Sequence, residues 1–209
     1  MPLTTFLLVL VVGYVVVKLI GLTQSRGRIK FLGLTIAAVI FFIMQLTALT
    51  NFFIADAFFS NTAAFIFEWG HIICLAFVLS SLAVFIRESK PAFAQFPMLY
   101  TGLPLLIVLS YLLVKDTYAL KNWLITIYQG GAITVSILMY SVYTYRRKQY
   151  AIILSGSIIL LFSYLLYWFV PAVNGPYTWL WELFLAAGLL TTVLGYEHAD
   201  SAVITADTQ

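Results

Sequence analysis

The stretch Phe65-Ile-Phe-Glu-Trp-Gly-His-Ile-Ile-Cys-Leu75, FIFEWGHIICL, places a carboxylate and an imidazole inside an otherwise apolar run. Glu68 and His71 are three residues apart, so on a helix their side chains lie on one face. The run extends over residues 62–86, which is longer than the roughly 20 residues that cross the hydrocarbon core of a bilayer. The stretch therefore predicts a membrane helix that carries two ionisable groups on one side.

The rest of the chain has the same character. Of its 209 residues, 63% are hydrophobic and 9% are charged, and the mean hydropathy is +1.01. A water-exposed fold needs more polar surface than this, which excludes a soluble domain. We expect one all-α membrane domain over residues 1–198, a seven-helix bundle, followed by a short cytoplasmic tail over residues 199–209. The predicted spans are residues 4–22, 31–50, 62–86, 97–114, 121–145, 150–171 and 177–196.

The basic residues predict the orientation of the bundle. Lysine and arginine in short loops stay in the cytoplasm, and nine of the eleven basic residues flank alternate connections. We therefore expect an outside N-terminus, a cytoplasmic C-terminus and a multi-pass protein of the bacterial inner (plasma) membrane. The net charge of +3 follows from this topology and does not indicate nucleic acid. The nine are Lys18, Arg26, Arg28, Lys30, Arg87, Lys90, Arg146, Arg147 and Lys148, and the other two are Lys115 and Lys121.

With this orientation, polar side chains of several helices fall at one depth, in the outer third of the bundle. An ionisable group within a membrane helix is costly unless it is partnered or reached by water, so it indicates function. We predict an outward-facing ligand-binding site there. The alternative is that these groups hydrogen-bond between helices and only hold them together. The predicted site residues are Gln45, Glu68, His71, Tyr128, Gln129, Tyr164, Tyr167 and Glu182.

The same residues argue against a cofactor, a metal or a catalytic centre. A bis-histidine haem needs two histidines at one depth, but His71 and His198 are predicted on opposite sides of the membrane. A di-iron bundle needs a second Glu-x-x-His motif, and a retinal pigment needs a lysine in the last helix; both are missing from the sequence. No nucleophile–base pattern of a hydrolase is present either. We expect neither cofactor nor metal, and a protein that is not an enzyme.

The order of features suggests an internal repeat. A basic segment ending at Lys30 precedes Glu68 by 38 residues, and a second one ending at Lys148 precedes Glu182 by 34. This pattern predicts three helices, a linking helix and three helices again, with both triplets in the same orientation, as in parallel repeats of transporters. The alternative is that two unrelated halves follow the same general rules for membrane helices.

A resemblance rests on SRGRIKFLGLTIAAVIFF, on an outer loop with Asp56, and on FIFEWGHIICLAFVLSSLAVFIRESKP. In helix lengths and loop charges, residues 25–95 resemble the seven-helix membrane sensor region of bacterial histidine kinases. The resemblance implies a sensory role and no particular site residue. The kinase region of that family is missing here, so a sensor would have to act on a separate protein.

Three functions remain open from the sequence. The first is a non-enzymatic binding or sensory module that passes its state to a separate membrane partner. The second is an accessory or structural subunit of a larger membrane complex, and the third is a small transporter. The expected partners are the lipid bilayer, a membrane protein or a second copy of the chain, and a small or lipid-like ligand, but no nucleic acid.

Overall fold

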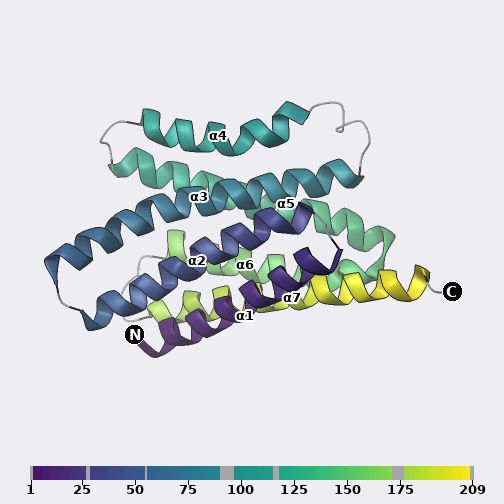
Figure 1. The fold of residues 1–209 in the computed structure, drawn as a ribbon, viewed down its shortest axis with the longest axis horizontal. Coiled ribbons are helices and arrows are strands. Elements are labelled where there is room, and N and C mark those ends of the chain that lie inside the picture. Colours follow the sequence, from purple (N-terminus) through teal and green to yellow (C-terminus); the bar gives the residue numbers. More distant parts are fainter. Residues whose placement is uncertain are drawn as a thin grey trace. The chain divides into compact units, whose positions relative to one another are not determined.

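A computed structural model describes residues 2–26, 29–54, 56–89, 97–114, 118–170 and 177–207, and over them the chain is almost entirely helical (Figure 1). Arg28, Lys90 and Lys115, which contributed to the predicted orientation, lie outside the described residues. The helices are α1 (Pro2–Arg26), α2 (Ile29–Phe53), α3 (Ala57–Ser89), α4 (Pro97–Leu113), α5 (Tyr118–Arg146), the short 3-10 helix η2 (Lys148–Tyr150), α6 (Ala151–Phe169) and α7 (Thr178–Asp207).

Each predicted span coincides with one of the seven α-helices. Among the described residues, six of these helices are long and apolar enough to cross a membrane. The helix α4, with 17 residues, is slightly shorter than the roughly 20 residues that cross the hydrocarbon core. The prediction of a helical, multi-pass membrane protein is therefore confirmed at this level. The helices α3 and α7 extend beyond their predicted ends, since helical hydrogen bonding continues into the polar residues that flank an apolar run. At the start of α3, for example, the amide of Ser60 donates to the carbonyl of Asp56 (3.0 Å).

The described residues form two compact units, and each is described by itself. The α2–α4 unit comprises residues 19–132, and the α6–α7 unit comprises residues 3–18 and 133–207. The division falls within α1 after Lys18 and within α5 after Ala132. In each unit, one antiparallel helix pair packs closely: α2 with α3, and α6 with α7.

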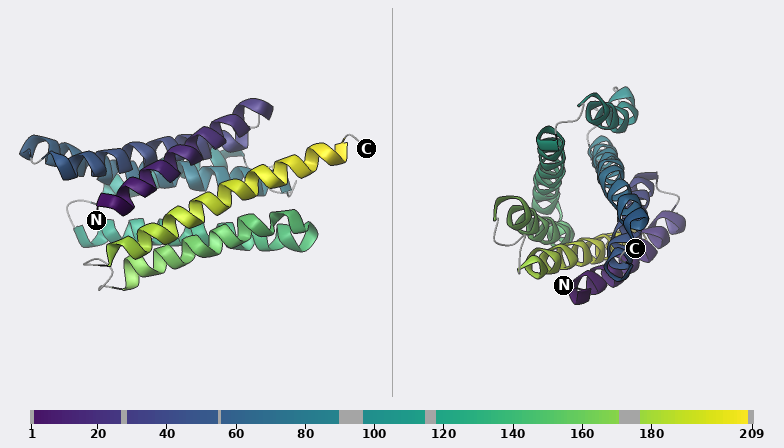
Figure 2. Two further views of the ribbon diagram at one scale, coloured as in Figure 1. Left: turned by 90° about the horizontal axis from the view of Figure 1, so that it is seen from below. Right: turned by 90° about the vertical axis from the view of Figure 1, so that its left-hand side faces the viewer.

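Glycines bring the α6 and α7 backbones together. A Cβ atom on Gly195 of α7 would lie 2.8 Å from the amide nitrogen of Ile153 on α6, and one on Gly188 would lie 3.0 Å from that of Leu160. Small residues allow membrane helices to approach in this way. Both views in Figure 2 show α6 beside α7 along most of their length. In the other unit, α2 and α3 approach at Gly70, where a Cβ would lie 2.6 Å from the sulfur of Met44.

A small apolar core in the α2–α4 unit includes part of the opening motif. Ile72 and Ala76 of α3 are buried against Ile107 and Tyr111 of α4. Partly buried side chains of α3, α4 and α5 pack around this core, namely Trp69, Leu79, Val108, Ile125 and Tyr128. The core therefore fixes how α3, α4 and α5 meet around Glu68.

Candidate functional site

Glu68 is the centre of a polar cluster built from three helices. Its Oε1 atom accepts a hydrogen bond from the hydroxyl of Tyr111 on α4 (2.7 Å). The same oxygen accepts from the ammonium group of Lys121 on α5 (2.8 Å), which makes an ion pair. We call Glu68, Tyr111 and Lys121 the Glu68 cluster. A charged and a neutral donor on one carboxylate oxygen stabilise the ionised form of the carboxylate.

Aromatic rings enclose this cluster from the side of the core. The Lys121 ammonium lies 5.1 Å from the centre of the Tyr111 ring, a favourable position for a cation. Trp69 packs edge-on against Tyr111, with ring centres 5.8 Å apart. A second polar contact between α4 and α5 joins the hydroxyls of Ser110 and Tyr128 (2.5 Å). Tyr128, one of the predicted site residues, thus lies near the cluster without being bonded to Glu68.

The Glu68 cluster is accessible from outside the unit. The Glu68 side chain is 40% exposed and that of Lys121 is 27% exposed. Lys121 is only three residues from the start of α5 at Tyr118, and Glu68 is eleven residues from the start of α3 at Ala57.

His71 does not join the cluster, although it lies one turn from Glu68. Its Nδ1 atom is 2.8 Å from the carbonyl oxygen of Phe67 in the preceding turn, so the imidazole bonds to its own helix. Its ring also packs against that of Phe67, with centres 6.1 Å apart. Among the described residues, no hydrogen bond joins His71 to Glu68. The two side chains share a helix face, as predicted, but their hydrogen bonds are separate among the described residues.

Glu182 lies in the α6–α7 unit, where its surroundings are very different. The residue is buried, with 9% exposure, and its Oε1 atom accepts a hydrogen bond from the hydroxyl of Thr5 on α1 (3.2 Å). The Oε2 atom is shielded from solvent and has no hydrogen-bond partner among the described residues. The indole nitrogen of neighbouring Trp181 is in the same state. This carboxyl group is therefore short of partners, whereas Glu68 is not.

The remaining predicted site residues have separate environments. Gln45 is buried on α2, and Gln129 is half-buried on α5. Tyr167 packs edge-on against Trp181, with ring centres 5.0 Å apart, and Tyr164 packs against Phe169. The two tyrosines therefore contact aromatic rings of their own unit, and neither contact involves another predicted site residue. Whether the eight residues form one layer stays a prediction.

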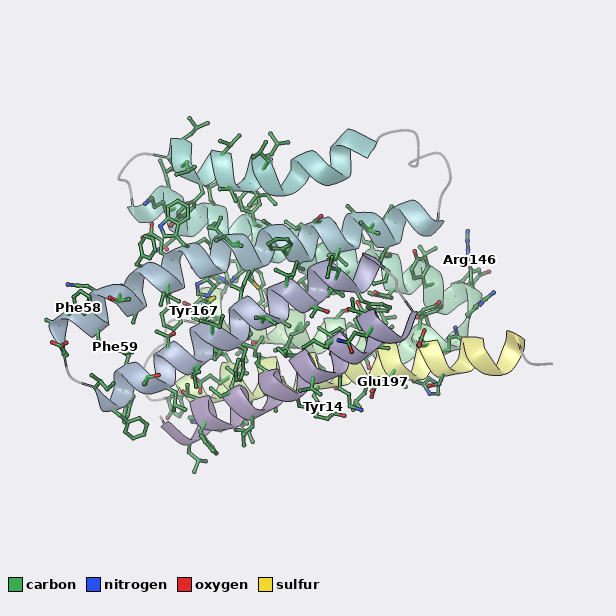
Figure 3. The ribbon with its side chains drawn as sticks, in the orientation of Figure 1. Tyr14, Phe58, Phe59, Arg146, Tyr167 and Glu197 are labelled. Carbon is green, nitrogen blue, oxygen red and sulfur yellow. The ribbon has the colours of Figure 1, made fainter. Side chains whose placement is uncertain are left out.

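A second ion pair lies at the other end of the α6–α7 unit. Lys18 of α1 and Glu197 of α7 are 2.7 Å apart, with side chains 35% and 32% exposed. The Lys18 ammonium also lies 5.3 Å from the ring centre of Tyr14. Figure 3 labels Tyr14 and Glu197 on the two helices that this pair joins. In distance and exposure it matches the Glu68–Lys121 pair, so it is a natural control for experiments on that pair.

Sequence reasoning did not include Lys121 and Tyr111 in the site. Lys121 served only to define the outer side. One signal was present: Lys121 was one of only two basic residues predicted on the outer side, where Glu68 was also predicted, and a lysine stem spans the distance between neighbouring helices. The part of the chain that the structure describes contains no group of three or more His, Cys, Asp or Glu side chains that could hold a metal ion.

Comparison of the sequence and fold with protein-family models, with curated proteins and with solved structures finds no match. A function is therefore inferred from the structure alone, chiefly from the Glu68 cluster and the helices that form it.

Proposed function

We propose that this integral membrane protein is a binding or sensory module whose ligand site is the Glu68 cluster, and that it passes its state to a separate membrane partner. The supporting observation is an accessible ion pair between α3 and α5 whose carboxylate also accepts a hydrogen bond from α4. Because α4 and α5 both contact one carboxylate oxygen of α3, a ligand that displaces either donor changes how three helices are held. Such a change is a means of passing binding on to a partner.

The charges of the cluster favour a small zwitterionic or anionic ligand. An incoming carboxylate or phosphate would compete with Glu68 for the ammonium of Lys121, and an incoming amine would compete with Lys121 for Glu68. The rings of Tyr111 and Trp69 provide an apolar wall beside the charges. Ligand sites commonly combine such a wall with a few polar groups that fix orientation.

A structural role is the second candidate, because the Glu68 cluster satisfies its own groups. An ion pair and a tyrosine hydroxyl on one carboxylate can simply hold α3, α4 and α5 together within a larger complex. The two roles differ in what removal of the charge does. A structural cluster loses stability when Glu68 is neutralised, whereas a ligand site loses binding.

The outside N-terminus and the parallel repeat are part of this proposal. An outer position of Glu68 and Lys121 follows from the distribution of basic residues. The repeat is supported by the presence of one closely packed antiparallel pair in each half, α2–α3 and α6–α7. The resemblance to kinase sensor regions fits a sensory role and adds no site residue.

Thermal unfolding of the purified protein in detergent, with a panel of amino acids, carboxylates and phosphorylated small molecules, tests the proposal. A ligand at a hundred times its dissociation constant stabilises the folded state by about 2.7 kcal/mol. We expect one chemical class to raise the Tm of the wild type and of a Lys18→Met/Glu197→Gln control, but not of Glu68→Gln or Lys121→Met. If no compound raises the Tm and Glu68→Gln alone lowers it strongly, the cluster is structural.

A further inference from the structure

Five basic side chains are described, and they fall into two groups. Lys18 and Lys121 each form an ion pair with a glutamate of another helix, at 2.7 and 2.8 Å. Arg146, Arg147 and Lys148 are exposed and follow one another in the chain. No other described residue forms an ion pair with any of these three. We call them the basic triplet, and their charges are available to a ligand from outside the chain.

The basic triplet lies in the short connection between α5 and α6, and Figure 3 labels Arg146 at the end of α5. One candidate membrane span ends at Arg146, and the next begins at Lys148. Only Arg147 lies between the two spans, in an extended conformation. Basic side chains at the ends of membrane helices lie at the level of the lipid headgroups. The first ligands that the triplet meets are therefore headgroups.

Contacts within the α6–α7 unit fix the shape of this connection. The amide of Arg147 donates to the carbonyl of Tyr143 (2.8 Å), and the amide of Tyr150 donates to the carbonyl of Arg147 (3.3 Å). The rings of Tyr143 and Tyr150 pack together, with centres 5.4 Å apart. Tyr143 also packs edge-on against the buried Tyr140 (5.9 Å). Because the backbone is already ordered, a ligand of the triplet does not have to order it on binding.

Two neutral groups beside the triplet lack hydrogen-bond partners. The side-chain nitrogen of Gln149 is shielded from solvent and has no acceptor among the described residues, and the hydroxyl of Thr144 is in the same state. A shielded donor without an acceptor is costly, and an oxygen of a ligand bound next to Lys148 would remove this cost for Gln149. Phosphate oxygens accept hydrogen bonds from neutral donors and, more strongly, from ammonium and guanidinium groups. One ligand class therefore suits both the charges and the amide.

The number of charges narrows this class. A single phosphodiester carries one negative charge and would leave two of the three cations without a counter-charge, whereas two phosphates would leave one. Consecutive Cα atoms are about 3.8 Å apart, so two phosphates joined by a short bridge can reach the triplet together. The second contact then forms within one bound molecule, which raises the affinity.

We propose that the basic triplet, with the amide of Gln149 as a further donor, binds the headgroup of an anionic phospholipid that carries two phosphates. The site consists of residues of the α6–α7 unit alone. It is independent of the Glu68 cluster and of the side of the membrane on which the connection lies.

Native mass spectrometry of the delipidated protein in detergent tests the proposal by titration with diphosphatidylglycerol, phosphatidylglycerol or phosphatidylcholine. Each basic residue near a membrane surface contributes about fivefold in affinity for anionic lipid. The wild type should therefore bind diphosphatidylglycerol about fivefold more tightly than phosphatidylglycerol, and phosphatidylcholine least. The variant Arg146→Gln/Arg147→Gln/Lys148→Gln should lose this preference and about a hundredfold in affinity. Its helix content in circular dichroism should not change, because the replaced side chains are exposed.

A matched control removes three positive charges from the first connection instead. Arg26→Gln/Arg28→Gln/Lys30→Gln should keep the wild-type preference, and an equal loss in both triple variants would overturn the proposal, because net charge alone would then explain binding. Equal affinity of the wild type for the two anionic lipids would also overturn it and would favour an acidic segment of a partner protein as the occupant. Displacement of the lipid by an equal concentration of inorganic pyrophosphate would assign the site to a soluble phosphate and not to a lipid.

Gln149→Leu tests the neutral donor, because it removes the amide without changing the charge. A hydrogen bond to a charged group contributes about tenfold in affinity, so this variant should bind diphosphatidylglycerol about tenfold more weakly. Without lipid, it should unfold at the wild-type temperature or above, since it removes an unpaired donor. Unchanged affinity for diphosphatidylglycerol would contradict the role given to Gln149.

Discussion

Two glycine-to-alanine substitutions should have opposite effects on stability, because the two glycines meet different surroundings. A Cβ added at Gly195 of α7 would lie 2.6 Å from Cγ1 and 2.8 Å from the amide nitrogen of Ile153 on α6. A Cβ added at Gly131 of α5 would meet nothing within 4 Å. Both glycines lie within continuous helices, so the change in helix propensity is the same at the two positions.

The structure sets the size of the difference. Ordinary contact begins near 3.4 Å, so the α6 backbone would have to retreat from Ala at position 195 by about 0.6 Å. Overpacking of a tight interface costs about 1–3 kcal/mol. At position 131 the substitution meets no obstacle and gains the helix propensity of alanine, about 0.5–1 kcal/mol. Because the gain in helix propensity is common to both variants, their free energies of unfolding should differ by the cost of overpacking, about 1–3 kcal/mol.

Thermal unfolding in detergent, followed by circular dichroism, measures this difference. For a chain of this size, 1 kcal/mol shifts the Tm by about 2–4 °C, so Gly195→Ala should unfold several degrees below Gly131→Ala, with the wild type between them. Gly188→Ala, which meets the Leu160 backbone nitrogen at 3.0 Å, should behave like Gly195→Ala. Equal Tm values for Gly195→Ala and Gly131→Ala would refute the close approach of α6 and α7.

Two further predictions concern topology and a buried hydrogen bond. Phe58 and Tyr145 are exposed (78% and 94%) and lie on opposite predicted sides of the membrane. In a Cys74→Ala background, a membrane-impermeant maleimide should therefore label Phe58→Cys but not Tyr145→Cys in intact cells, and it should label both after lysis. Labelling of Tyr145→Cys but not of Phe58→Cys in intact cells would invert the orientation. The hydroxyls of Tyr140 and Tyr196 are bonded at 2.7 Å in a buried position, so either change to Phe should cost about 1–3 kcal/mol by removing this buried hydrogen bond. The double variant should lose less than the sum of the single variants in chemical unfolding, and strict additivity would contradict the bond.

The helices could be predicted from the sequence because their signal is local. An apolar run such as residues 62–86 reports its own length and composition, and α3 forms over it and continues for a few residues at both ends. The prediction that Glu68 and Lys121 lie towards the same end of the bundle agrees with the ion pair between them; their depth in the membrane stays a prediction. Composition and periodicity are enough for both inferences.

The partners of each carboxyl group could not be predicted in this way, because lateral packing depends on which helix faces meet. The interhelical approach at Gly70 and Gly195 sets how neighbouring helices are rotated against each other, and this rotation decides which side chains face one another. In the sequence, Glu68 and Glu182 look alike: each follows a tryptophan-rich or aromatic segment near the outer end of a helix. In the structure their environments differ: the accessible Glu68 accepts from Lys121 and Tyr111, whereas the buried Glu182 accepts from Thr5.

The contrast between these two carboxyl groups bears on function. Glu68 is held by Lys121 and Tyr111, and its side chain is accessible, so a charged ligand can compete for the same partners. Glu182 is buried and accepts a hydrogen bond from Thr5 of its own unit, so it offers no exposed charge to such a ligand. The proposed ligand site is therefore the Glu68 cluster of the α2–α4 unit, and Glu182 belongs to the packing of the other unit.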